Sequence, residues 1–387
     1  MRGTAVVAEV GWVNGLAAIR SLGRAGLRVV ALDHRPWALG FTSRYAEPVL
    51  APEPQEDEAG FIAFLLELAK GFDEPVPIFP THDEHLNAIS RHWDELAAGY
   101  RFPFPRWEIL EPIQSKRHQL EQAAAIGVPI PRTLHPRTAE DARSGAEELG
   151  YPVFLKPSSP LEFKLVYKRQ AFMCETVSQL DEAYARMAPY QPMLQEFVPG
   201  GDDELYTLGS YIAADGDLLG TFSGRKLLQT RHLMGSARIG VSVWIDDVVD
   251  PGLALLRALR FHGISQVEFK RDPRDGLYKL IEVNPRLWQW HGLAGACGVD
   301  LPWIAYCDLT GRRLPPARMH LEGKVWSITL MSGLPPKPQW PPYVDGVFAL
   351  DDIGPALEQA KRHTARAFPR AADVWARRRQ MPSTRPA

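Results

Sequence analysis

The most constraining feature of this sequence is a polar segment between residues 267 and 286. Alternating apolar residues flank Pro273 and the pair Asp275-Gly276, which are turn-forming residues. This pattern predicts two antiparallel strands joined by a short loop at residues 272–276. Charged and amide side chains recur within both strands, so one face of the hairpin is predicted to be polar.

Four polar side chains are expected to share that face. Glu282 and Asn284 are two apart, so they leave the strand on the same side. In the register that the loop implies, Glu268 pairs with Leu280 and lies diagonal to Glu282, at roughly 7–8 Å between Cα atoms. Two carboxylates and an amide oxygen suit Mg²⁺ (or Mn²⁺), which proteins usually hold with one or two carboxylates plus substrate phosphates. Arg286 follows on the same face, so the segment predicts a site for phosphoryl transfer.

The segment LIEVNPR at residues 280–286, followed by GVDLP at 298–302, resembles the ATP-grasp superfamily. The resemblance is to its carboxylate–amine ligase and carbamoyl-phosphate-synthase-like branch. It implies that ATP and Mg²⁺ bind between two α+β subdomains and that a substrate carboxylate becomes an acyl phosphate. An amine or a similar nucleophile would then displace phosphate. The alternative is an exposed polar hairpin with a surface ion cluster.

The predicted fold combines α/β and α+β regions. Residues 4–10 and 27–33 read as buried strands around a helix, which is a βαβ unit and implies a parallel sheet. A helix at 61–68 and a strand at 76–79 follow. The resemblance implies a Rossmann-like pre-ATP-grasp domain at 1–112, first and second ATP-grasp subdomains at 113–192 and 193–315, and a C-terminal extension at 316–387.

Several residues are candidates for ATP binding through the resemblance. Lys156 ends the apolar run 151–155, where its ammonium needs a polar partner, and the family places such a lysine on the α and β phosphates. Lys116 resembles a second nucleotide-binding cation. Gln195 lies in the segment 193–200, which resembles the connection between the two subdomains. In that segment the main chain of Glu196 and Val198 would bind adenine, and Glu204 would bind the ribose hydroxyls.

The remaining catalytic candidates are Arg225 and Lys226, which follow the predicted strand 218–222. In the family this region faces the γ-phosphate and the acceptor carboxylate, and Arg286 would stabilise charge on the transferring group. One departure from the family is the absence of glycine between Pro157 and Arg169. Ser158, Ser159, Lys164, Lys168 and Arg169 would have to replace main-chain donors there.

Composition narrows the function classes. The chain has 387 residues and a net charge of −2, which favours neither nucleic acid nor a membrane surface as a partner. Its three cysteines, Cys174, Cys297 and Cys307, match no zinc spacing and are expected to be free, buried thiols in a reducing compartment. We expect a cytoplasmic protein with a small-molecule carboxylate and amine as partners, and a homodimer as a possible assembly.

Other readings stay open at this level. Gly11, Gly15 and Asp33 invite a dinucleotide site, although the middle glycine of the fingerprint is missing. Ligands of open α/β sheets lie at the carboxyl ends of strands, which makes Asn14, Asp33, Thr81 and Asp83 substrate-contact or capping residues. The rivals to a ligase are therefore a carboxylating enzyme acting through carboxyphosphate, a non-catalytic nucleotide-binding protein and a Rossmann-type oxidoreductase.

Overall fold

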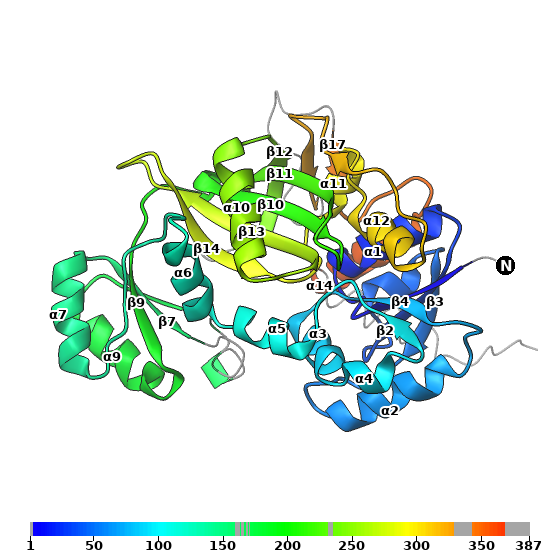
Figure 1. The fold of residues 1–387 in the computed structure, drawn as a ribbon, viewed down its shortest axis with the longest axis horizontal. Coiled ribbons are helices and arrows are strands. Elements are labelled where there is room, and N and C mark those ends of the chain that lie inside the picture. Colours follow the sequence, from blue (N-terminus) through cyan, green and yellow to red (C-terminus); the bar gives the residue numbers. More distant parts are fainter. Residues whose placement is uncertain are drawn as a thin grey trace, which may run out of the picture.

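The computed structural model describes residues 3–158, 163, 166–167, 169, 171–230, 235–328 and 343–367. Three sheets organise these residues, and Figure 1 shows the eight-stranded sheet between the other two. Trp340 and Arg377–Arg379, considered from the sequence as part of the C-terminal extension, lie outside the described residues, as do Ser159, Lys164 and Lys168.

The first sheet is parallel, with the order β3-β2-β1-β4-β5. Its buried strands are rich in β-branched residues, as expected where helices cover a parallel sheet. The strands are β1 (Thr4–Ala8), β2 (Arg28–Asp33), β3 (Ala46–Leu50), β4 (Val76–Pro80) and β5 (Tyr100–Arg101). The helices are α1 (Val13–Arg24), η1 (Leu39–Thr42), α2 (Glu58–Ala69), α3 (Asp83–Arg91) and α4 (Trp93–Leu96). The βαβ unit predicted at the N-terminus is confirmed.

Two helices, α5 (Trp107–Ile113) and α6 (Lys116–Ala125), lead to the second sheet. The hydroxyl of Ser115 accepts a hydrogen bond from the N–H of His118, so Ser115 is the N-cap of α6. The second sheet is antiparallel, with the order β6-β9-β7-β8. It consists of β6 (Thr133–Leu134), β7 (Val153–Pro157), β8 (Phe172–Cys174) and β9 (Pro192–Glu196), with α7 (Ala139–Leu149), α9 (Val177–Met187) and η2 (Ala188–Tyr190).

The third sheet has eight strands, ordered β14-β13-β10-β11-β12-β16-β17 with β15 beside β11. Its strands are β10 (Leu205–Ile212), β11 (Leu218–Gln229), β12 (Ala237–Ser242), β13 (Gly263–Arg271), β14 (Tyr278–Asn284), β15 (Ala317–Arg318), β16 (Val325–Ser327) and β17 (Tyr343–Asp345). The other elements are η3 (Asp202–Glu204), α10 (Asp246–Ala258), α11 (Gly292–Ala296), α12 (Leu301–Leu309) and α14 (Gly354–Ala367).

The hairpin β13–β14 forms as predicted, but its register is different. Glu268 pairs directly with Glu282, and Phe269 pairs with Leu280, because a bulge lies between these two pairs. A bulge inserts one extra residue, here Ile281, into one strand and changes which side chains share a face. Leu280 therefore packs into the core beneath the sheet, whereas the predicted register would have placed it beside Glu268. The prediction that Glu268 and Glu282 are diagonal neighbours was wrong, and the two acids lie opposite each other.

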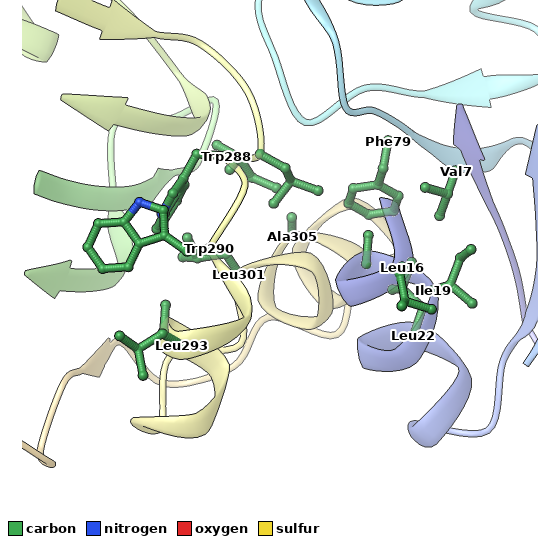
Figure 2. Packing of buried hydrophobic residues seen from close by; sticks show 14 of the residues in the cluster. Val7, Leu16, Ile19, Leu22, Phe79, Trp288, Trp290, Leu293, Leu301 and Ala305 are labelled. Carbon is green, nitrogen blue, oxygen red and sulfur yellow. The ribbon is translucent and has the colours of Figure 1, made fainter. Parts of the chain in front are cut away.

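One hydrophobic core joins the first and third sheets. Leu16 and Ile19 of α1 pack in the same cluster as Leu293 of α11 and the buried Trp288 and Trp290 (Figure 2). A Cβ at Gly224 or Gly240 would lie within 3 Å of the Trp290 ring, so glycine at both positions lets the indole approach the strands. The loop after β14 is therefore fixed between the two sheets, and it carries residues of the site described below.

Two further findings concern expectations from composition. Cys174, Cys297 and Cys307 are free and buried, as predicted. Among the described helices, none has both the length and the apolar character that a bilayer crossing requires.

Candidate active site

A single large cavity of about 1730 Å³ collects residues from all three sheets. Near the second sheet it is lined by Lys156, Gln195, Glu196 and Val198. The hairpin β13–β14 lines its middle with the predicted metal residues, and the carboxyl ends of β1, β2 and β4 border the opposite part. A volume of this size, lined by groups from distant parts of the chain, can hold more than one small molecule.

The predicted metal residues lie together in this cavity, and each carboxylate has a lysine partner. Lys226 Nζ lies 2.6 Å from Glu268 Oε1, and Lys116 Nζ lies 2.7 Å from Glu282 Oε2. Asn284 donates from Nδ2 to Glu282 Oε1 at 3.1 Å, which leaves its amide oxygen without a partner in the described residues. The hairpin thus brings two acids, one amide oxygen and two lysines to one place.

The two acids differ in their affinity for a proton. Burial and the neighbouring Glu282 charge raise the pKa of Glu268, against the opposing effect of Lys226. Burial also acts to raise the pKa of Glu282, but Lys116, Asn284 and Lys226 outweigh it and hold this pKa well below its usual range. Glu282 is therefore the more strongly ionised member of the pair at neutral pH.

A divalent cation fits this donor set. Two facing carboxylates and a free amide oxygen are hard ligands of the kind that Mg²⁺ binds. The lysines already neutralise both acids, which shows that the position favours positive charge. Within the described residues, no three His, Cys, Asp or Glu side chains form a metal-binding group, so an amide or substrate oxygen would have to complete the coordination.

The nucleotide candidates line the cavity beside the second sheet. Lys156 donates to Gln195 Oε1 at 2.6 Å, and Gln195 in turn donates to Thr133. Burial, followed by the nearby Lys116 charge, lowers the pKa of Lys156 to about 7. The main-chain N–H of Val198 has no partner among the described residues, so it is free to donate to a ligand. Phe154 and Phe197 line the cavity beside it.

Glu196 has more contacts than the sequence suggested. Its N–H donates to the Arg132 carbonyl oxygen, so that group is not available to adenine. Its carboxylate accepts from Arg274 at 2.9 Å and from Lys279 at 3.1 Å, and Asp272 binds the same two cations. The side chain therefore ties the end of β9 to the hairpin loop. The sequence interpretation, which gave Glu196 only a main-chain role, was incomplete.

Two predicted site residues do not line the cavity. Arg225 leaves β11 on the face opposite to Lys226 and binds Asp203 instead. Side chains alternate along a strand, so the two adjacent cations leave β11 on opposite faces, and the structure gives no support for the predicted catalytic role of Arg225. Glu204, predicted to bind ribose, lies outside the lining as well, with Arg271 Nη1 at 3.9 Å from its carboxylate. The structure gives no support for that ribose contact.

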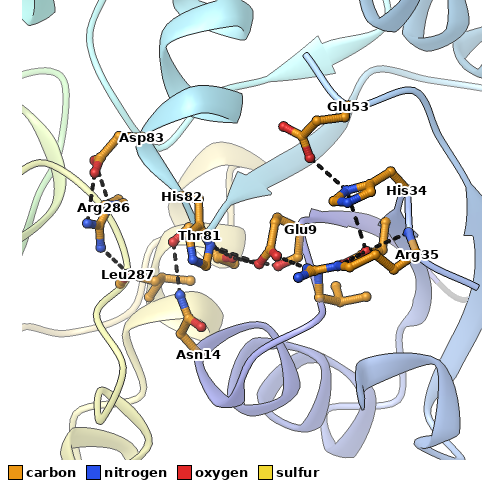
Figure 3. Close-up of polar contacts among 12 residues, drawn as sticks. Glu9, Asn14, His34, Arg35, Glu53, Thr81, His82, Asp83, Arg286 and Leu287 are labelled. Atoms are coloured by element: carbon orange, nitrogen blue, oxygen red, sulfur yellow. Dashed lines mark hydrogen bonds and ion pairs between the residues drawn. The ribbon is translucent and has the colours of Figure 1, made fainter. Parts of the chain in front are cut away.

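Arg286 lines the cavity, and its guanidinium is bound by an acid that follows β4 of the first sheet. Asp83, at the start of α3, accepts from Nε at 2.6 Å and from Nη2 at 2.9 Å (Figure 3). Such a bidentate pair fixes the plane of the guanidinium. The Asp83 charge offsets burial and raises the pKa of Arg286. Arg286 is therefore a permanently charged group in a set orientation near Glu282.

The residues that suggested a dinucleotide site have other partners. Asp33 accepts from the main-chain N–H groups of Val10 and Arg35 and from the Arg35 side chain. Arg35 also binds Glu9, whose carboxylate lies 2.8 Å from His82 Nδ1 (Figure 3). A Cβ on Gly11 would clash with the Arg35 guanidinium, so Gly11 makes room for this arginine. The ribose-binding and phosphate-binding positions of an oxidoreductase are thus occupied by the chain itself.

Some lining residues were missed from the sequence. Lys270 and Gln266 lie two positions on either side of Glu268 and share its face, so strand periodicity could have identified both. In the glycine-free segment, Arg169 lines the cavity, whereas the Ser158 hydroxyl donates to the Gln191 carbonyl oxygen. No local signal could have shown that α14 borders the cavity, because its position depends on contacts with the first sheet.

Comparisons with known proteins show which sequences this chain is similar to. No protein-family profile matches the chain. It is 27% identical over 216 residues to D-aspartate ligase of Enterococcus faecium, an alignment that covers 53% of this chain and 51% of that protein. It is 24% identical over 316 residues to the large chain of carbamoyl phosphate synthase of Thermomicrobium roseum, covering 77% of this chain and 27% of the relative. The chain thus spans about half or less of these relatives.

Solved structures show the fold. Biotin carboxylase of Campylobacter jejuni, in complex with an ATP analogue, has a TM-score of 0.65 and 18% identity over 81% of this chain and 72% of its own. N5-carboxyaminoimidazole ribonucleotide synthetase of Thermus thermophilus has a TM-score of 0.60 and 18% identity over 82% of this chain and 80% of its own. The resemblance to ATP-grasp proteins, first drawn from the hairpin motif, is confirmed by the sequence relatives, and the solved structures share the fold of this chain.

Proposed function

From an ATP-grasp fold with relatives among the ATP-dependent ligases, we propose that this protein activates a carboxylate as an acyl phosphate and joins it to an amine. The observation that supports the proposal most strongly is the facing pair Glu268 and Glu282, each bridged by a lysine, in the cavity that also contains Lys156 and Arg286. Carboxylates, an amide and several fixed cations in one cavity are what phosphoryl transfer requires.

Each residue has a proposed task. Lys156 and Lys116 neutralise the ATP phosphates, and the N–H of Val198 binds the adenine edge. Glu268, Glu282 and Asn284 would hold Mg²⁺, which supplies charge neutralisation on the phosphates when bound. Lys226 attracts the transferring phosphoryl oxygens once Glu268 no longer engages it. Arg286, oriented by Asp83, stabilises charge on the acyl phosphate and on the tetrahedral species formed when the amine attacks.

The test is release of ADP that depends on both an acid and an amine. D-Aspartate is the first acid to try, because one relative is named as a D-aspartate ligase, and ammonium is the simplest amine. We expect ADP and an amide product in equal amounts, with no turnover in excess chelator. Full turnover in chelator, or ADP release unaffected by any acid in a broad panel, would argue against a ligase.

A second candidate is a carboxylating enzyme in which bicarbonate is the activated acid. It is favoured by the alignment with carbamoyl phosphate synthase over most of this chain. Bicarbonate-stimulated ADP release, measured in degassed buffer with and without added bicarbonate, separates the two candidates. If ATP–Mg²⁺ binds but neither acid nor bicarbonate promotes turnover, the chain is a nucleotide-binding protein without this activity.

A further inference from the structure

The C-terminal helix α14 borders the cavity at the end formed by the first sheet. Gln359, Arg362 and His363 of this helix are among the lining residues. The segment before the helix is anchored in the first sheet, because Asp352 accepts from the buried Arg20 at 2.9 Å and from Ser43 at 2.8 Å. Breaking a buried ion pair is costly, so the helix is held firmly in place.

Two arginines line this wall of the cavity. Arg362 binds Glu358 through Nε and donates from Nη2 to the main-chain oxygen of Trp37. Arg35, two residues before Trp37, uses Nε and Nη2 for Asp33 and Glu9. Two residues of extended chain span at most about 7 Å, so both arginines adjoin the same short loop. Nη1 of each has no partner in the described residues, and both line the cavity.

More donors without a partner occur along the loop after β14. Trp288 and Trp290 line the cavity with only 2% and 1% of their surface exposed, and neither indole N–H has a hydrogen bond to the part of the chain that the structure describes. The loop lies against the start of α1, since His291 Nε2 is 3.0 Å from the Asn14 carbonyl oxygen. Buried donors without acceptors are costly and call for an explanation, and an ordered water or a ligand could satisfy them.

The acids near these groups are largely engaged. Asp83 binds Arg286, Glu358 binds Arg362, and Glu9 and Asp33 are buried behind Arg35. The exposed indoles of Trp12 and Trp37 line the same region and would cover a small ligand without competing for its oxygens. The wall therefore presents donors and apolar surface to the cavity, together with the amide oxygen of Gln359, which has no partner among the described residues.

We propose that this end of the cavity binds an oxyanion, a carboxylate or a phosphate, that one substrate carries in addition to its reacting group, and that Arg362 sets this preference. The proposal rests on the proposed function, because it assumes that a substrate extends from the hairpin toward α14. It makes the C-terminal helix part of the substrate site and assigns it a role in specificity.

Binding of matched small probes tests the proposal directly, with the quenching of tryptophan fluorescence or calorimetry as the readout. The probes are succinate, its monoamide succinamate, and 3-phosphonopropionate, in which a phosphonate replaces one carboxylate. We expect the full chain to bind at least one of the two dianions roughly tenfold or more tightly than the monoamide, as hydrogen bonds to charged groups allow. Tighter binding of the phosphonate would identify a phosphate as the natural group, and tighter binding of succinate a carboxylate.

The variant Arg362→Gln should abolish this preference, and Arg362→Lys should restore part of it. Lys361→Gln is the matched control, because Lys361 is on the same helix and 77% exposed, and it should bind the probes as the parent does. Unfolding temperatures of all variants check that α14 remains docked. No preference for either dianion in the parent, a preference unchanged in Arg362→Gln, or tighter binding of the monoamide would each overturn the proposal.

Failure here can be distinguished from failure of the proposed function. Binding of ATP–Mg²⁺ is measured by calorimetry on the same preparations, and it uses the opposite end of the cavity. ATP binding with acid-dependent ADP release but without a dianion preference would refute only the role of Arg362. Dianion binding without any ATP binding would refute the ligase and leave the anion site standing.

Discussion

Two pairs of acids in this protein each bind basic side chains, but they differ in the kind of hydrogen-bond donor that holds them. One pair is Glu268 and Glu282, and the other is Asp33 and Glu9. Among the described residues, Glu268 and Glu282 on the hairpin accept hydrogen bonds from side chains alone, chiefly those of Lys226 and Lys116. Asp33 in the first sheet accepts from two main-chain N–H groups as well as from Arg35, and Arg35 also binds Glu9. The first pair can exchange its partners without moving the backbone, whereas Asp33 cannot.

This contrast separates a reactive acid cluster from a structural one. Lysine ammonium groups sit on flexible stems and can turn from a carboxylate to a phosphate, while a clamped arginine is fixed in orientation. Raised pKa at Glu268 and lowered pKa at Glu282 also mark the hairpin as a place of competing charges, which is common at functional sites. The comparison predicts catalytic loss in one region and loss of stability in the other.

The largest effect is expected for Glu282→Gln. The change keeps the shape of the side chain but removes a charge that we propose holds Mg²⁺, and the loss of such an electrostatic contact typically costs roughly 10²–10³ in kcat. ADP release under saturating ATP is the measurement, with the unfolding temperature checked alongside. Asp94→Asn is the control, because Asp94 forms an exposed ion pair with Arg106, and it should leave both ADP release and the unfolding temperature unchanged. A Glu282→Gln enzyme within about threefold of the parent on that scale would remove the hairpin from the mechanism.

The second effect is on stability and concerns Asp33→Asn. The new amide can accept at one oxygen only and turns an NH₂ group toward main-chain or guanidinium donors. Because Asp33 is buried, we expect a loss of roughly 3 kcal/mol in the free energy of unfolding, measured by urea titration. Turnover per folded molecule should change little. Unaltered stability with lost turnover would instead make Asp33 a ligand-binding acid, and the two acid pairs would then not differ in function.

The third effect is a loss of kcat in Asp83→Asn, because the ion pair of Asp83 with Arg286 connects the first sheet to the hairpin site. Asp83→Asn should leave the arginine charged but less well oriented, so kcat and kcat/KM should fall together, by about tenfold, while ATP affinity holds. Steady-state kinetics and ATP calorimetry provide the two readouts, with Arg286→Ala as the more severe reference. Should Asp83→Asn weaken ATP binding and spare kcat, Arg286 would be a nucleotide ligand and not a transition-state group.

Much of the fold could be predicted from local pattern, because hydrophobic periodicity and turn residues determine where strands and helices form. The hairpin and its polar face were predicted correctly for this reason. The register was not, since a bulge at Ile281 leaves no local signal in the sequence. The difference between Arg225 and Lys226 could have been predicted, because strand alternation places the two side chains on opposite faces and only Lys226 lines the cavity.

Other errors were not avoidable from one sequence. The partners of Glu196, such as Lys279, are distant along the chain, so its side-chain role depends on tertiary structure. The same holds for Asp83 with Arg286, and for the docking of α14 through Asp352. As a consequence, Glu196→Ala, which would be mild if only the main chain of Glu196 had a role, should disturb the contact between β9 and the hairpin loop.

The smallest effect is a pH dependence that tests whether Lys156 behaves like the exchangeable lysines of the hairpin. Burial lowers the pKa of Lys156 to about 7, so the free protein carries this ammonium below that pH and loses it above. Phosphates bind the charged form, and binding above pH 7 must therefore take up a proton. The charged fraction of Lys156 falls roughly threefold between pH 6.5 and 7.5, so the Kd for ADP–Mg²⁺ should rise by about that factor.

Calorimetry in buffers of different ionisation enthalpy should show that ADP–Mg²⁺ binding takes up a proton at pH values above 7. Lys156→Arg keeps its charge over this pH range, so both the Kd and the proton uptake should change little with pH in this variant. Any change that remains in Lys156→Arg comes from titration of the nucleotide itself and can be subtracted. An affinity that rises with pH in the parent, or the same slope in Lys156→Arg, would mean that Lys156 does not contact the phosphates.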